Sequence, residues 1–127
     1  MQQANEIAAL FDEWNQAIQS GDPDRVTALY ASDGILLPTV SNLVRHNHAE
    51  IRDYFVHFLT KHPKGEINES NVRIFDELAI NSGVYTFCFS PPGQTPFTAV
   101  ARFTFVYRRQ ADRWLIVEHH SSLMPER

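Results

Sequence analysis

The residues with the clearest chemical potential in this chain lie toward its C-terminal end. Arg102 stands in the largely hydrophobic run from Val100 to Tyr107, where an unpaired guanidinium would be very costly to bury. Glu118 and His120 follow in a second, mainly apolar run. A guanidinium is suited to bidentate binding of a carboxylate, and a carboxylate or an imidazole can act as a general base. The sequence therefore points to a site for an anion, for acid–base chemistry, or for both.

Two interpretations of Arg102 stay open at this stage. In the first, Arg102 forms an ion pair with Glu118 on a neighbouring strand, with no cavity beside it. In the second, Arg102 lines a cavity and binds a small carboxylate. Regular strand alternation from Trp114 onward puts Glu118 and His120 on one face and His119 on the other. We therefore expect Arg102, Glu118 and His120 to converge on the inner wall of a pocket.

The sequence predicts no metal site and no cofactor. Adjacent histidines on a strand, such as His119 and His120, point to opposite faces and cannot share one ion. His46 and His48 lie at a helix start without an evident third ligand. The five glycines are dispersed, so there is neither a dinucleotide-binding fingerprint nor a phosphate-binding loop. The single cysteine, Cys88, excludes a thiolate cluster within one chain.

Composition narrows the class of protein. The 127 residues fit one domain, spanning 1–127, and the 43% hydrophobic content supplies a core. The net charge of −4 argues against nucleic acid as a general partner. No apolar run reaches the ~20 residues of a membrane span. The first residues lack the basic-then-apolar order of a signal peptide, so we expect a cytoplasmic protein that does not bind membranes.

The first half of the chain has the pattern of helices. Apolar residues recur at three- and four-residue steps from Ala4 to Gln19, which predicts an amphipathic helix. Asp22-Pro23 predicts the start of a short second helix that ends before Asp33-Gly34, with Tyr30 facing inward. Short strands are expected at 35–37 and 43–44. Asn47, with Glu50 three residues later, predicts the N-terminus of a third helix that ends at Pro63 and Gly65.

The second half has the pattern of strands and turns. Strands are expected at 67–75, 78–80, 84–89, 97–108 and 114–123, with a turn at 81–83. Helices followed by a meander of strands predict an α+β fold, with the helices on one face of a curved antiparallel sheet. The strand at 97–108 is hydrophobic on both faces. Three helices cover only one of them, so we expect a second copy of the chain to cover the other.

At this point the chain resembles a known family. It is similar to the association (hub) domain of calcium/calmodulin-dependent protein kinase II, a branch of the nuclear transport factor 2-like, or cystatin-like, superfamily. The resemblance runs through nearly the whole sequence and rests on Ala17-Ile18, Gly21-Asp22, Ala28–Tyr30, Ser41–Val44, Asp53–Phe55, Tyr107–Arg109, Arg113-Trp114 and His120. It implies a cone-shaped fold with a pocket at its open end and assembly into dimers or larger rings. It also implies that His120, and less securely Arg102, belongs to the pocket.

Two functional hypotheses follow. The first is a homo-oligomerising module that binds a small anionic ligand, with a binding set of Arg102, His120, Glu118, Trp14, Tyr30, Tyr54 and Phe58. The alternative is an enzyme of the ketosteroid isomerase or polyketide cyclase kind, which needs a base beside an oxyanion stabiliser. Glu118 or His120 would be the base, and Tyr30, Tyr54 or Arg102 the stabiliser. Trp14 is also expected in the core, against Phe55 and Phe58.

Overall fold

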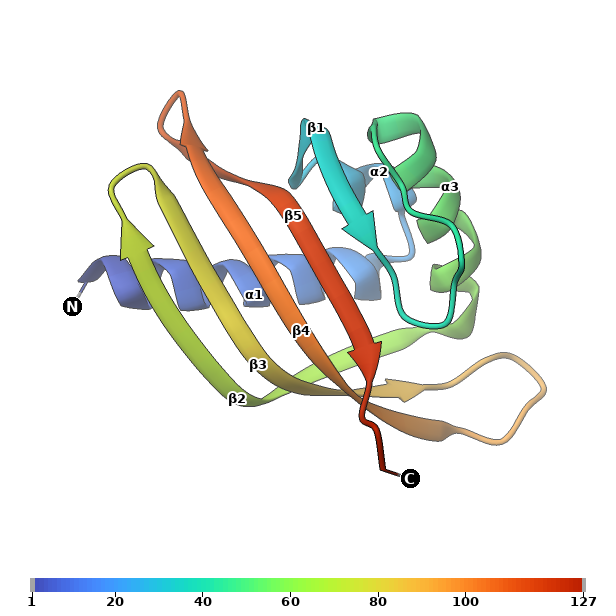
Figure 1. Cartoon of the computed structure of the whole chain (residues 1–127). Helices are drawn as coiled ribbons and strands as arrows, with labels where there is room; N and C mark the ends of the chain where they lie inside the picture. The colour runs from blue at the N-terminus through green and yellow to red at the C-terminus, as the bar shows by residue number, and fades with distance from the viewer. Residues whose placement is uncertain (1, 127) are drawn as a thin grey trace.

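The structure consists of three α-helices, a 3-10 turn and a five-stranded sheet, whose first strand lies between the second and third helices in the sequence. The computed structural model describes residues 2–126. Figure 1 shows the long first helix running behind the sheet, with the two shorter helices beside one end of it. The elements are α1 (Gln2–Ser20), α2 (Pro23–Thr27), β1 (Tyr30–Leu37), α3 (His48–Phe58), the 3-10 turn η1 (Leu59–Lys61), β2 (Pro63–Phe75), β3 (Leu78–Phe89), β4 (Phe97–Gln110) and β5 (Arg113–Leu123).

Local signals fixed the helix starts, and both predicted caps are present. Asp22 accepts a hydrogen bond from the backbone N–H of Asp24 at 2.9 Å, and Pro23 is the first residue of α2. Asn47 accepts one from the N–H of Glu50, also at 2.9 Å. The helix ends differ from prediction. Tyr30 begins β1 instead of ending a helix, and α3 stops at Phe58, before η1.

The sheet is mixed, not wholly antiparallel as predicted. Its strand order is β1-β5-β4-β3-β2, and the edge strand β1 runs parallel to β5. The first strand and the last are thus neighbours in space, a pairing that residue patterns within either strand do not encode. This pairing brings residues near Tyr30 beside the last strand, where they help to build the site.

The turn predicted at residues 81–83 is wrong, because β3 continues through it. The turn falls after Phe75 instead, and Gly83 pairs with Ser70, next to a bulge in β2 between Ile67 and Glu69. A Cβ atom at Gly83 would lie 1.9 Å from the carbonyl oxygen of Glu69. Glycine is therefore required here for close backbone approach, not for a chain reversal.

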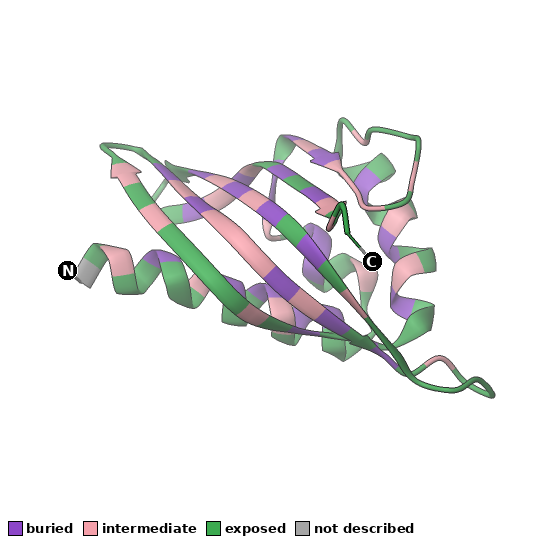
Figure 2. Cartoon of the chain, turned by 60° about the horizontal axis from the view of Figure 1, so that its bottom comes forward, coloured by how far each residue is buried: buried purple, intermediate pink, exposed green. Residues whose placement is uncertain are grey.

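The core lies between α1, α3 and the inner face of the sheet. Buried and exposed residues alternate along the strands in Figure 2, as expected for a sheet with one covered face. Trp14 is 2% exposed and packs edge-on against Phe55 of α3, with ring centroids 6.5 Å apart. The predicted position of Trp14 in the core, against Phe55, is confirmed.

Candidate functional site

A pocket opens between the inner face of the sheet, α3 and the loop that follows β1. Its volume is about 410 Å³, within the ~300–1,000 Å³ of typical small-molecule sites. The buried part of the wall is mainly aromatic and aliphatic and comprises Trp14, Leu36, Phe55, Tyr85, Phe87, Phe89, Ala101, His119 and Ser121. The exposed residues Val40, His57, Lys61, Phe97 and Leu123 mark the mouth.

A chain of hydrogen bonds connects residues of the buried wall, with Tyr30 as the one member behind it. The indole N–H of Trp14 lies 3.1 Å from Tyr30 Oη, which lies 2.8 Å from His119 Nδ1. On the other side of the ring, His119 Nε2 lies 3.3 Å from Tyr85 Oη, and Tyr85 Oη lies 2.7 Å from Ser121 Oγ. Four elements contribute to this chain, namely α1, β1, β3 and β5.

The direction of each hydrogen bond follows from the first donor. An indole nitrogen can only donate, so Tyr30 Oη accepts from Trp14 and its own proton is free for His119 Nδ1. The proton of a neutral His119 is then on Nε2, where it is donated to Tyr85 Oη. The Tyr85 hydroxyl in turn donates to Ser121 Oγ. This assignment gives each of these buried groups at least one hydrogen-bond partner.

Burial sets the protonation of the groups in the chain. It lowers the pKa of His119 to about 3, with a smaller contribution from neighbouring His120. It also raises the pKa of Tyr30 and of Tyr85 well above that of a free phenol. At neutral pH the chain is therefore uncharged, which is consistent with its apolar surroundings.

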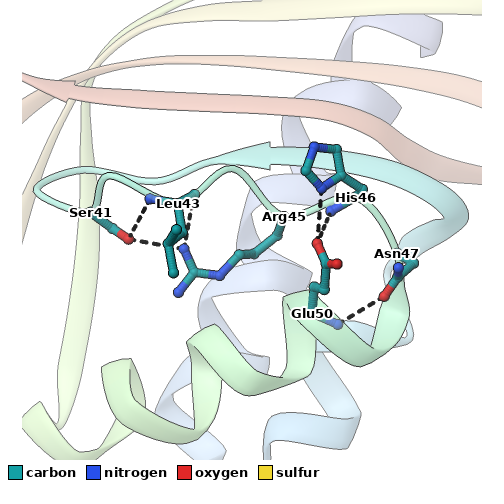
Figure 3. Close-up of polar contacts among 6 residues, drawn as sticks. All are labelled: Ser41, Leu43, Arg45, His46, Asn47 and Glu50. Atoms are coloured by element: carbon teal, nitrogen blue, oxygen red, sulfur yellow. Dashed lines mark hydrogen bonds and ion pairs between the residues drawn. The ribbon is translucent and has the colours of Figure 1, made fainter.

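The mouth of the pocket has a different character, because it carries positive charge. Arg45 lies in the loop after β1, where its side chain donates to Ser41 Oγ at 2.9 Å and also contacts the carbonyl of Leu43 (Figure 3). Its guanidinium also lies over the ring of Tyr54, 5.3 Å from the centroid. Lys61 lies over Phe89 on the same rim. Burial raises the pKa of Tyr54 to about 12, so its phenol stays neutral.

The loop that carries Arg45 is not the strand expected at 43–44. One isolated bridge joins Leu36 and Arg45, with a 2.9 Å backbone hydrogen bond in each direction. The loop then leads into α3 through Asn47, and Glu50 accepts from the backbone and the ring of His46 (Figure 3). These contacts hold Arg45 at the rim. The sequence analysis missed Arg45, although it stands just before the predicted helix cap.

The predicted site residues divide into two groups. Trp14, Tyr54 and Phe58 line the pocket, and Tyr30 lies directly behind it, bonded to His119. Arg102, Glu118 and His120 are exposed on the opposite face of the sheet. The expectation that these three converge on the inner wall is wrong. Arg102 lies opposite Ser122, and Glu118 lies opposite Val106. Arg102 and Glu118 are therefore not cross-strand neighbours, as an ion pair between paired strand positions would require.

A β-bulge in β5 explains the difference. Val106 pairs with Glu118 but the next residue, Tyr107, pairs with Ile116, so Val117 has no partner on β4. The extra residue reverses the alternation. Trp114 and Ile116 face inward before it, and His119 and Ser121 face inward after it. No glycine or proline in β5 marks the bulge, so the sequence alone gave no signal for it.

Within residues 2–126, no cluster of three or more histidine, cysteine or acidic side chains is arranged to hold a metal ion. In the same part of the chain, no helix has the length and hydropathy needed to cross a membrane.

Comparisons with known proteins place this geometry in a family. A search of curated protein sequences gives no significant match. Among solved structures, a Xanthomonas campestris protein described as a calcium/calmodulin-dependent protein kinase II association domain is 51% identical, with a TM-score of 0.93 over 96% of this chain and 88% of that one.

Two distant structures share the fold alone. One is a nuclear transport factor 2-like superfamily protein from Salmonella enterica, 13% identical, with a TM-score of 0.85 over 97% of this chain and 92% of that one. The other, a candidate dehydratase of that family from Streptomyces avermitilis, is 14% identical, with a TM-score of 0.85 over 97% and 96%. The family model of the calcium/calmodulin-dependent protein kinase II association domain matches residues 3–125. The chain therefore belongs to that family, on a nuclear transport factor 2-like, cystatin-like fold.

Proposed function

We propose that this protein is a homo-oligomerising module that binds a small anionic molecule with an apolar body in the pocket. The observation that carries the proposal is the composition of the pocket wall. Aromatic side chains form its buried part, Arg45 and Lys61 stand at its rim, and the described lining includes no aspartate or glutamate. A pocket with this distribution favours a hydrophobic ligand whose negative charge remains near the mouth.

The contents of the pocket support binding over proton-transfer catalysis. An isomerase or cyclase would need a base inside the cavity, and the two bases first considered, Glu118 and His120, are exposed on the other face of the sheet. The histidine that does reach the pocket, His119, accepts a hydrogen bond from Tyr30 at Nδ1 and has a strongly lowered pKa. Its affinity for a substrate proton is therefore low at neutral pH.

The outer face of the sheet supports the oligomeric part of the proposal. Helices cover the inner face only (Figure 1). Half-buried or exposed aliphatic residues lie on the outer face of the two central strands, namely Ile80, Val84, Val100 and Val106. Arg102 lies among them, opposite Val84, and Glu118 and His120 lie on the adjoining strand β5. Aliphatic residues interspersed with arginine are found in protein interfaces, and a second copy is the expected partner.

Titration calorimetry with benzoate, cyclohexanecarboxylate and the corresponding neutral amides tests the ligand. We expect both carboxylates to bind and both amides to bind more weakly. Arg45→Gln and Lys61→Gln should each reduce carboxylate affinity, because each removes a positive charge at the rim. Arg25→Gln is the matched control, since Arg25 is exposed on α2, away from the pocket. Equal binding of acids and amides would disprove the anionic preference.

A further inference from the structure

The hydrogen-bond chain ends on the pocket wall with one hydroxyl donor more than the described side chains accept. Ser121 Oγ accepts from Tyr85, and it also contacts the hydroxyl of Thr39, which lies beside it on the pocket wall. Whichever of Ser121 and Thr39 donates to the other, one hydroxyl proton remains without an acceptor among the described residues. Ser121 is only 7% exposed and Thr39 is half-buried, so the access of bulk water to this pair is restricted.

The direction of the hydrogen-bond chain ensures that the Ser121–Thr39 end always presents an unused hydroxyl donor. The chain begins at an indole N–H, which cannot accept, and passes through a His119 that is kept neutral by burial. Each hydrogen bond is therefore donated in the same direction, from Trp14 through Tyr30, His119 and Tyr85 to Ser121. The chain cannot reverse to offer an acceptor there unless Tyr30 or His119 loses its partner, which would leave a buried polar group unsatisfied.

We propose that this terminal hydroxyl pair, Ser121 and Thr39, receives a neutral carbonyl oxygen of the ligand, while the ligand's carboxylate lies at the Arg45 and Lys61 rim. This inference rests on the proposed function and specifies its ligand class as an aromatic or alicyclic oxo acid. The pair offers one hydroxyl proton, and among the described residues no cationic side chain is hydrogen-bonded to it. A carboxylate there would be a buried charge without a counterion, whereas a ketone or amide oxygen is satisfied by one donor.

Three probes of similar shape separate the two polar ends. They are 4-acetylbenzoate, 4-isopropylbenzoate, in which a methyl group replaces the carbonyl oxygen, and 4-acetylbenzamide, which lacks the charge. We expect 4-acetylbenzoate to bind about tenfold more tightly than 4-isopropylbenzoate, because the isopropyl group leaves the buried hydroxyl without an acceptor. Equal affinity of the two benzoates would overturn this inference and leave the proposed function standing. Failure of both benzoates to bind would overturn both proposals.

A variant lacking the donors tests the residues themselves. The triple substitution Ser121→Ala, Thr39→Val and Tyr85→Phe removes the terminal hydroxyl pair and the tyrosine hydroxyl bonded to it. It should abolish the preference for 4-acetylbenzoate over 4-isopropylbenzoate. Ser122→Ala, the neighbour on the outer face, is the control and should keep the preference. An unchanged preference in the triple variant would assign the carbonyl to another site.

The vibrational frequency of the bound ligand tests the same inference on the wild-type protein, so the result does not require that the triple variant folds. The carbonyl stretch of bound 4-acetylbenzoate, labelled with carbon-13 at the ketone, should lie at a lower frequency than that of its methyl ester in hexane, because the hydrogen bond weakens the C=O bond. A frequency equal to that in hexane would show a carbonyl without a donor and would overturn the inference.

Discussion

Tyr30 and His119 stand 89 residues apart in sequence, yet the phenol oxygen of one lies 2.8 Å from Nδ1 of the other. Tyr30 is the first residue of β1 and His119 lies in β5, so this contact depends on the parallel pairing of those strands. It fixes the tautomer of a histidine that borders the pocket. The architecture of the sheet thereby determines which hydrogen-bonding groups the pocket presents.

The buried His119 should make stability depend on pH. Its pKa is about 3 in the folded protein and about 6.5 in an unfolded chain. Between these values the unfolded state binds more protons, so the free energy of unfolding falls as the pH is lowered from about 6.5 toward 3. The contribution of His119 approaches roughly 1.4 kcal/mol per pH unit below about pH 6.

Urea unfolding of the wild type and of His119→Gln at several pH values between 7 and 5 checks this. The variant should be less stable at pH 7 but should lose less stability on acidification. A parallel pH dependence of the two proteins would contradict a neutral, buried His119.

Trp14→Ala should lower the free energy of unfolding by about 3–5 kcal/mol. The indole packs among aromatic rings from α3 and the sheet and donates to Tyr30. Chemical denaturation measures the change. Gln16→Ala, at an exposed position of the same helix, should leave the midpoint nearly unchanged.

Gly83→Ala should destabilise the protein by about 1–3 kcal/mol, because the new methyl group would overlap the backbone of Glu69 and the two strands would have to separate. Ser82→Ala, one residue earlier in β3, is the control and should have little effect. Thermal unfolding of both variants makes the comparison. Equal melting temperatures would show that the β2 bulge adapts without cost.

Val84→Glu should convert an oligomer into a 14.6 kDa monomer. Val84 is half-buried on the outer face and lies directly opposite Arg102 on β4, so the monomer can accommodate the new carboxylate. A second copy packed on that face would have to bury the charge. Sedimentation velocity at micromolar concentration reports the change, with Gln16→Glu as control. A monomeric wild type would rule out the dimer.

Local features of this fold could be predicted, whereas pairings between distant residues could not. The N-caps at Asp22 and Asn47 depend on residues two or three positions away, and both were found from sequence. The run from Leu78 to Phe89 was divided at residues 81–83 because a glycine at the end of such a segment is typical of a turn. Gly83 is instead required by the close approach of the neighbouring strand β2, which the sequence of β3 does not show. The position of β1 beside β5 is likewise decided by tertiary packing.

The same distinction applies to the site. Trp14, Tyr54 and Phe58 were identified because a helical period shows which face is apolar. Glu118, His119 and His120 were each assigned to the wrong face, because period-two alternation assumes that a strand has no bulge. Arg45 lies in a loop, where neither period applies, and only its contacts with Ser41 and Tyr54 show that it borders the pocket.

The unpaired Val117 gives β5 two possible sets of inward-facing side chains. With the extra residue in place, the strand presents a neutral imidazole and a hydroxyl to the cavity. If β4 carried one more residue to pair with Val117, the alternation along β5 would run unbroken and would instead turn Glu118, His120 and Ser122 inward, a carboxylate and an imidazole of the kind that general acid–base catalysis uses. A single insertion in β4, with β5 itself unchanged, could thus exchange a binding site for the beginnings of a catalytic one.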